Sequence, residues 1–239
     1  SGWPEAFGAG CGGEAEGQLN ADGSFGTRAD VELDFNCGDL AVGMGDGTDW
    51  SVDARYAGDS RPEVTPGDGS LRVHAEGDGF PFGEGRQEWS VTLPTESELA
   101  LSIEANASSS TLDLAGGSFS EIDLDTNAGS VTLDLSGTTA DDLRIGMNAG
   151  SMALTADDET SFTASVEMNA GSMELCIPDG VAFAITLEES NITFSHNLDD
   201  SGLSRSGDTW RGGSGAETIT LGVQGNAASF TLNPDGGCS

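Results

Sequence analysis

The chain has 239 residues, 36 of them Gly, and its 41 acidic and 8 basic side chains give a formal net charge of −33. Nucleic acids and anionic membranes bind basic surfaces, so the charge excludes both as partners. No stretch reaches the ~20 apolar residues of a membrane span. The two His and four Cys residues show none of the usual zinc-binding spacings.

The predicted elements begin after a Gly-rich arm, which we assign to residues 1–18. Apolar and polar residues then alternate through much of 19–100, the N-terminal β region, and this period is typical of strands with one buried face. Three such strands are centred on Leu33, Val42 and Val91. Residues 101–239 continue as repeats and closing strands. We therefore expect one continuous all-β domain over 19–239, with no significant helix.

A four-residue motif recurs every 21 residues in the second half of the chain. It begins at Asn106 as Asn-Ala-Ser-Ser, and at Asn127, Asn148 and Asn169 as Asn-Ala-Gly-Ser. Weaker copies occupy residues 190–193 and 226–232, and residues 36–40 hold a fainter echo. Asn and Gly tolerate left-handed backbone, so each motif is predicted to form a corner between two strands.

Each 21-residue unit predicts two strands of about five to seven residues, one on either side of its corner. Ile145 and Met147 alternate with polar residues before the third corner, and Met152 and Leu154 do so after it. One unit cannot bury such a face alone, whereas stacked copies bury it in a continuous core. The pattern therefore favours a solenoid-like, β-helix-like stack.

The four cysteines, Cys11, Cys37, Cys176 and Cys238, favour two disulfides and an oxidising compartment. Three pairings are open. We favour Cys11–Cys37, which would hold the Gly-rich start against the first strands, and Cys176–Cys238, which would hold the C-terminus. The opening Ser-Gly-Trp-Pro sequence suggests a mature product from which a signal or anchor has been removed.

The acidic residues raise one question about cofactors, which is whether their carboxylates bind a cation such as Ca²⁺. Asp123 and Asp125 alternate with apolar residues, so the solvent face of a strand explains them fully. The stretch from Asp123 also resembles the start of a Ca²⁺ loop, but that pattern needs Gly one place earlier and a Glu further on. With Asp134 and Glu174, the pair would line an acidic face that holds Ca²⁺ weakly. No other cofactor is expected.

Four segments, taken in order, resemble a known family. They are Glu88–Pro94, which contains a Trp, Thr111–Leu114, Asn127–Gly137 and Ile177–Val181. Over about residues 30–232 the chain resembles the toast-rack domains of LiaF-like (DUF4097-type) envelope-stress proteins and their relatives with adhesin-like β-repeats. The resemblance implies a toast-rack stack at the bacterial cell envelope, and a binding or sensing module without catalysis.

The motifs of catalysis are missing from the sequence. It holds no G-x-S-x-G, and neither His74 nor His196 has a recognisable triad context. Paired carboxylates leave a carbohydrate-active enzyme as the least favoured hypothesis. We favour a non-enzymatic extracellular or surface protein, structural or adhesive, that assembles with itself into a filament or layer, because open strand edges template further strands. The alternative is a monomeric ligand-binding or stress-sensing module of the envelope.

Overall fold

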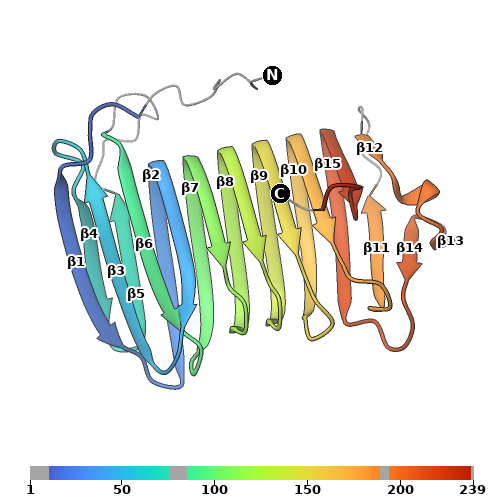
Figure 1. Cartoon of the computed structure of the whole chain (residues 1–239), viewed down its shortest axis with the longest axis horizontal. Helices are drawn as coiled ribbons and strands as arrows, with labels where there is room; N and C mark the ends of the chain where they lie inside the picture. The colour runs from blue at the N-terminus through green and yellow to red at the C-terminus, as the bar shows by residue number, and fades with distance from the viewer. Residues whose placement is uncertain (1–10, 76–84, 189–193, 238–239) are drawn as a thin grey trace.

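The computed structural model describes residues 11–75, 85–188 and 194–237 (Figure 1). The all-β, solenoid-like prediction is confirmed, since the described residues form fifteen strands and a single 3-10 turn, η1 (Leu198–Asp200). The strands are β1 Gly17–Ser24, β2 Arg28–Gly45, β3 Asp49–Tyr56, β4 Pro62–Gly67, β5 Ser70–Ala75, β6 Gln87–Pro94, β7 Glu98–Asp113, β8 Ser118–Asp134, β9 Thr139–Thr155, β10 Ser161–Cys176, β11 Phe183–Glu188, β12 Phe194–His196, β13 Ser204–Ser206, β14 Thr209–Gly212 and β15 Ile219–Leu232.

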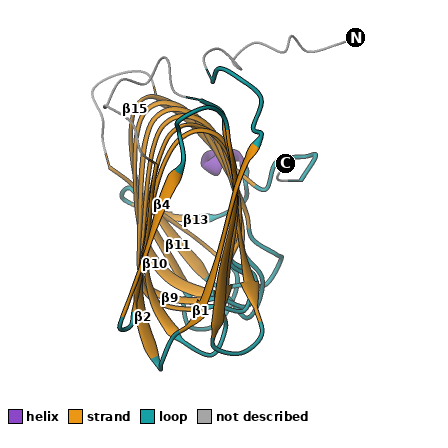
Figure 2. Cartoon of the chain, turned by 90° about the vertical axis from the view of Figure 1, so that its left-hand side faces the viewer, coloured by secondary structure: helices purple, strands orange, loops and turns teal. Residues whose placement is uncertain are grey.

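The repeats form a parallel stack in which β7, β8, β9 and β10 lie side by side. Each strand bends once, so that its halves belong to two facing walls joined by arcs at the corners (Figure 2). We call the wall before the corner, residues 98–105 in β7, wall A, and the wall after it, residues 108–113, wall B. The sequence pattern predicts two strands in each repeat, whereas strand pairing continues past the corner and makes one strand of 16 or 17 residues.

The core lies between the two walls, where side chains of equal position in successive repeats stack in columns. Leu101, Ile122 and Leu143 form one column of wall A, and each is at most 1% exposed. A matching column of wall B consists of Leu112, Leu133, Leu154 and Leu175. Because each repeat covers the apolar faces of its neighbours, the stack is stable only as a whole.

The corners are joined by a ladder of asparagine side chains. The Nδ2 group of each Asn donates to the Oδ1 atom of the Asn in the adjacent strand, over 2.5–3.0 Å. The ladder comprises Asn36, Asn106, Asn127, Asn148, Asn169 and Asn226. The four predicted corner residues and both outlying copies at positions 36 and 226 thus lie in one row.

Sequence order and spatial order differ at both ends of the stack. The last strand, β15, lies directly on β10, and β11 and β12 lie beyond it. At the other end, β2 lies on β7, and β5 and β6 lie beyond β2. Antiparallel strands then close the two ends: β3 and β1 after β6, β4 after β5, and β14 and β13 after β11.

Two segments next to the described boundaries differ from, or fall outside, the predicted layout. Strand β1 begins at Gly17, so the last two residues assigned to the N-terminal arm belong to the sheet. The weak repeat copy at 190–193 lies outside the described residues. The strands on either side of this copy, β11 and β12, both pair with β15.

Candidate binding groove

A groove of about 630 Å³ lies on the outer surface of wall B. Five neighbouring strands, β1, β3, β6, β2 and β7, form its floor, and their register places the lining side chains in two rows. One row is Gln18, Arg55, Glu88, Asp39 and Ser109. The other is Asn20, Asp53, Ser90, Ala41 and Thr111.

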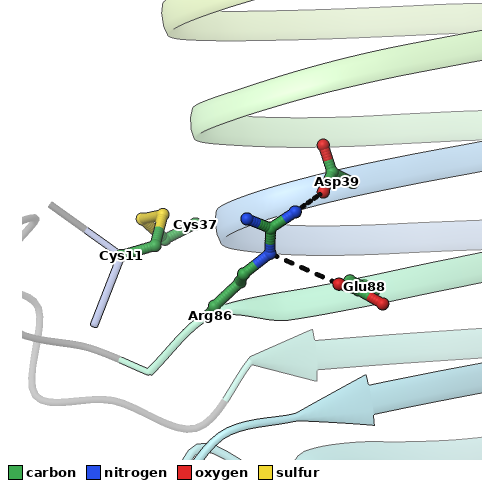
Figure 3. Close-up of a disulfide and its surroundings, with 5 residues drawn as sticks. All are labelled: Cys11, Cys37, Asp39, Arg86 and Glu88. Atoms are coloured by element: carbon green, nitrogen blue, oxygen red, sulfur yellow. Dashed lines mark hydrogen bonds and ion pairs between the residues drawn. A yellow bond between two sulfur atoms is a disulfide. The ribbon is translucent and has the colours of Figure 1, made fainter. Parts of the chain in front are cut away.

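Two arginines neutralise much of the acidity in the first row. Arg55 Nη1 lies 3.1 Å from Glu88 Oε2. Arg86 lies 3.3 Å from the other oxygen of Glu88 and 2.5 Å from Asp39, and its side chain points toward both carboxylates (Figure 3). Asp53 in the second row makes no ion pair with any described residue. The groove therefore presents amides, hydroxyls, one unpaired carboxylate and bound guanidinium groups, which suit a polar ligand held by hydrogen bonds.

A disulfide fixes the chain at the corner end of this groove. Cys11 is bonded to Cys37, the favoured pair, with Cα atoms 5.7 Å apart (Figure 3). Cys37 occupies the corner position that Ala holds in β7–β10, and it is only 5% exposed. The Arg86 N–H donates to the carbonyl of Gly12, and the Arg55 side chain donates to the carbonyl of Ala15. The arm is thus attached beside the arginines of the groove.

The second favoured disulfide, Cys176–Cys238, stays a prediction. Cys176 ends β10, whereas Cys238 lies outside the described residues. The described cysteines include no free thiol.

The outer surface of wall A holds a smaller acidic hollow of about 470 Å³, lined in part by Glu32, Glu121 and Asp123. Burial raises the pKa of Asp123, the neighbouring Asp125 raises it further, and Arg144 opposes both effects. Arg144 itself pairs with Glu121 and Asp142. The positive charge beside these carboxylates is therefore the guanidinium group of Arg144 itself.

The four acids expected to bind Ca²⁺ do not come together. Asp123 and Asp125 lie on wall A, whereas Asp134 and Glu174 lie on wall B. Asp134 Oδ1 instead accepts hydrogen bonds from the N–H and hydroxyl of Ser136, at 2.9 and 2.6 Å. Within 11–75, 85–188 and 194–237, no three His, Cys, Asp or Glu residues are arranged to hold a metal ion. The expectation of one shared acidic face is wrong, because the corner sends the two halves of β8 to opposite walls.

The groove has no signature in the sequence that predicts it. Its residues come from segments 18–20, 39–41, 53–55, 88–90 and 109–111, and no motif joins them. One usable signal was alternation over 17–24, where Leu19 and Ala21 alternate with polar residues, but the first two residues of this segment were assigned to the Gly-rich arm. The antiparallel pairing of β1, β3 and β6 brings these segments together.

The fold is an all-β stack of bent, parallel strands closed by antiparallel strands at each end. The family model described as the N-terminal domain of toast_rack, DUF2154, matches residues 13–152, which is more than half of the chain. The chain therefore belongs to this family, in agreement with the resemblance seen in the sequence. None of the curated proteins matches the chain in sequence.

Comparison with solved structures finds a similar architecture in one of two neighbours. A proposed cell adhesion protein from Clostridium sporogenes aligns with a TM-score of 0.62 at 15% identity, over 90% of this chain and 99% of that one. A proposed adhesin from Bacteroides fragilis aligns over 91% and 97% of the two chains at 10% identity, with a TM-score of 0.31. The first likeness supports the fold alone. No helix in the described part of this chain is long and apolar enough to cross a membrane.

Proposed function

We propose that this chain is a non-catalytic structural or adhesive protein of the bacterial cell surface or extracellular space, which assembles with itself. The observation that carries the proposal is the amide ladder from Asn36 to Asn226, which joins six strands of one continuous sheet into a stiff stack with edges at both ends. The Cys11–Cys37 disulfide supports a location outside the cytoplasm, because disulfides persist in oxidising compartments.

Native size tests this proposal directly. Light scattering and negative-stain microscopy of the full chain would be compared at low and high salt, with Ca²⁺ or a chelator, and with or without a reductant. Ordered particles larger than one chain would support a structural role, and the condition that dissolves them would identify what joins them. A monomer under every condition would reject self-assembly.

The groove favours a second candidate function, a monomeric module that binds a polar ligand. Its amides, hydroxyls and the carboxylate of Asp53 are hydrogen-bonding groups suited to the hydroxyls of a neutral glycan. The test is glycan-array binding by the wild-type chain and by Asp53→Ala, with Asp125→Ala on wall A as a control of equal charge. Loss of one charged hydrogen bond is expected to weaken binding by about 10- to 100-fold. Turnover of a bound glycan would reject the non-catalytic role.

A further inference from the structure

The outer edges of the sheet are not equally protected against pairing. Strand β4, at the outer edge of wall A, contains Pro62 and Pro66, which have no N–H to donate. Strands β12 and β13, the outermost at the far end of the stack, have three residues each. Proline and short length are two of the ways in which proteins block edge-to-edge association.

Strand β1 has neither protection. It is eight residues long, contains no Pro, Lys or Arg, and pairs on one side only, with β3, among the described strands. Its inward residues Leu19 and Ala21 are half-buried, although they pack against the core. Val64 of β4 is also half-buried at the same end of the stack. An unblocked edge therefore lies beside an incompletely covered apolar end of the core.

We propose that β1 pairs antiparallel with β1 of a second copy of this chain, about a two-fold axis through Asn20. In this register Gln18 faces Asp22 of the second copy, and Leu19 faces Ala21 of the second copy. Polar residues therefore stay on the outer surface and apolar residues on the inner surface. Asp22 is the strand's single charge and faces an uncharged amide, so no like charges lie directly opposite each other.

A second copy fits this edge because the strand is complementary to itself in that register, as a two-fold interface requires. The net charge of −33 opposes the approach of two copies, so pairing is expected to depend on salt. Gln18 and Asn20 also line the border of the groove, so pairing would join the grooves of two copies across the axis. This inference deepens the proposed self-assembly by naming the surface that carries it.

Cysteine scanning of the full chain tests the axis. Cα atoms directly opposite in an antiparallel pair are about 4.5–5.5 Å apart, which a disulfide can span. Asn20→Cys is therefore expected to form a covalent dimer on mild oxidation in about 1 M NaCl, where the Debye length is about 3 Å. Gln18→Cys and Asp22→Cys would place two identical thiols about 13 Å apart and should not cross-link. Thr111→Cys on β7, also exposed on wall B, is the control.

A charge series provides a second measurement, by sedimentation at several salt concentrations. Asn20→Asp places like charges opposite each other and is expected to weaken the dimer by about 2- to 5-fold at low salt, whereas Gln18→Arg faces Asp22 and should strengthen it. Thr111→Asp adds the same charge away from the edge and should change little. Equal cross-linking of Asn20→Cys and Thr111→Cys would overturn the interface. If ordered particles still form in that case, the proposed structural role stands without this interface.

Discussion

At the scale of single residues, each corner depends on Asn and Gly for different physical reasons. The Asn side chain both donates and accepts, so identical amides stacked at the strand spacing satisfy one another. The Gly two places later has φ of 136–141° in β8, β9 and β10, which side-chain-bearing residues rarely adopt. The equivalent positions in β7 and β15 hold Ser108 and Ala228, which do not have positive φ.

The middle of the amide ladder is expected to be sensitive to truncation. Asn148→Ala removes two amide hydrogen bonds, of 2.6 Å to Asn127 and 2.7 Å from Asn169, and should lower the free energy of unfolding by about 1–2 kcal/mol. Ser151→Ala removes an exposed hydroxyl from the same corner and should cost less than about 0.5 kcal/mol. Urea unfolding of both variants checks this, and equal midpoints would show that the ladder adds no stability.

A side chain at the corner glycine is expected to disturb the stack. In Gly150→Ala the new Cβ atom would lie 2.1 Å from the carbonyl oxygen of Gly129, at φ +140°. The free energy of unfolding should fall by about 1–3 kcal/mol. A larger loss is not expected, because the chain can form this corner without positive φ, as it does at Ser108. Gly43→Ala on β2 meets nothing within 4 Å and should be neutral or stabilise by up to about 1 kcal/mol. Thermal unfolding of the pair measures the contrast.

At the scale of elements, turns opposite the corners bind neighbouring repeats together. The hydroxyl of Thr138 donates to the carbonyl of Leu114, at 2.7 Å. The hydroxyl proton of Thr160 is shared between the carbonyl of Leu135, at 2.9 Å, and Oδ1 of Asp157, at 2.7 Å. Asp157 accepts from the N–H of Gly137 in the turn before it, at 2.8 Å. Each turn is therefore fixed by bonds to the previous turn as well as by its own sequence.

The turn at Asp157 is expected to make stability depend on pH. The hydrogen bond from the Gly137 N–H lowers the pKa of Asp157, and the Thr160 hydroxyl lowers it further. Because the folded pKa is below the ordinary value, the stabilisation is fully present above about pH 4 and is lost as the pH falls through the folded pKa. Asp157→Asn should therefore unfold at a lower temperature than wild type at pH 7, with the difference shrinking toward pH 2. A difference independent of pH would show that charge is not involved.

The attachment of the arm to β2 is expected to contribute strongly to stability. The disulfide closes a sequence separation of 26 residues, and its loss should cost about 2–4 kcal/mol. The double variant Cys11→Ala, Cys37→Ala removes it while placing at position 37 the residue that β7–β10 hold there. Urea midpoints and limited proteolysis ahead of Gly17 measure the effect. An unchanged midpoint would show that the corner holds the arm without the bond.

At the scale of the whole molecule, charge opposes folding and association. The formal net charge is −33, and seven of the eight basic residues already make ion pairs within the described ranges. Such exposed pairs stabilise weakly. Mutual repulsion of the remaining carboxylates therefore dominates the electrostatic contribution.

Salt is accordingly expected to stabilise the chain. Raising NaCl from about 0.01 to about 1 M shortens the Debye length from about 30 to about 3 Å. We expect Tm to rise by at least about 4 °C, which corresponds to ~1 kcal/mol or more for a chain of this size. Differential scanning fluorimetry with NaCl and KCl measures the rise, which should be equal for both salts. A falling Tm would mean that the arginine ion pairs outweigh the repulsion.

The sequence by itself determined the repeated unit of this protein. Alternation around Asn127, Asn148 and Asn169 defines which residues face the core, because side chains of a strand alternate strictly between its two faces. A fixed spacing of 21 residues then brings identical residues into register, so the stack and its corner row follow from local pattern. The copies at 36 and 226 were recognisable for the same reason.

Only the tertiary structure decided how the ends are built and where the groove lies. Local periodicity says that a segment is a strand but not which distant edge it pairs with, so nothing in it places β15 between β10 and β11. Gln18, Asp53 and Glu88 likewise meet because β1 and β3 return antiparallel along β6. Pairing between distant segments depends on which edges and core faces remain uncovered once the repeats have stacked, and that is a property of the assembled chain.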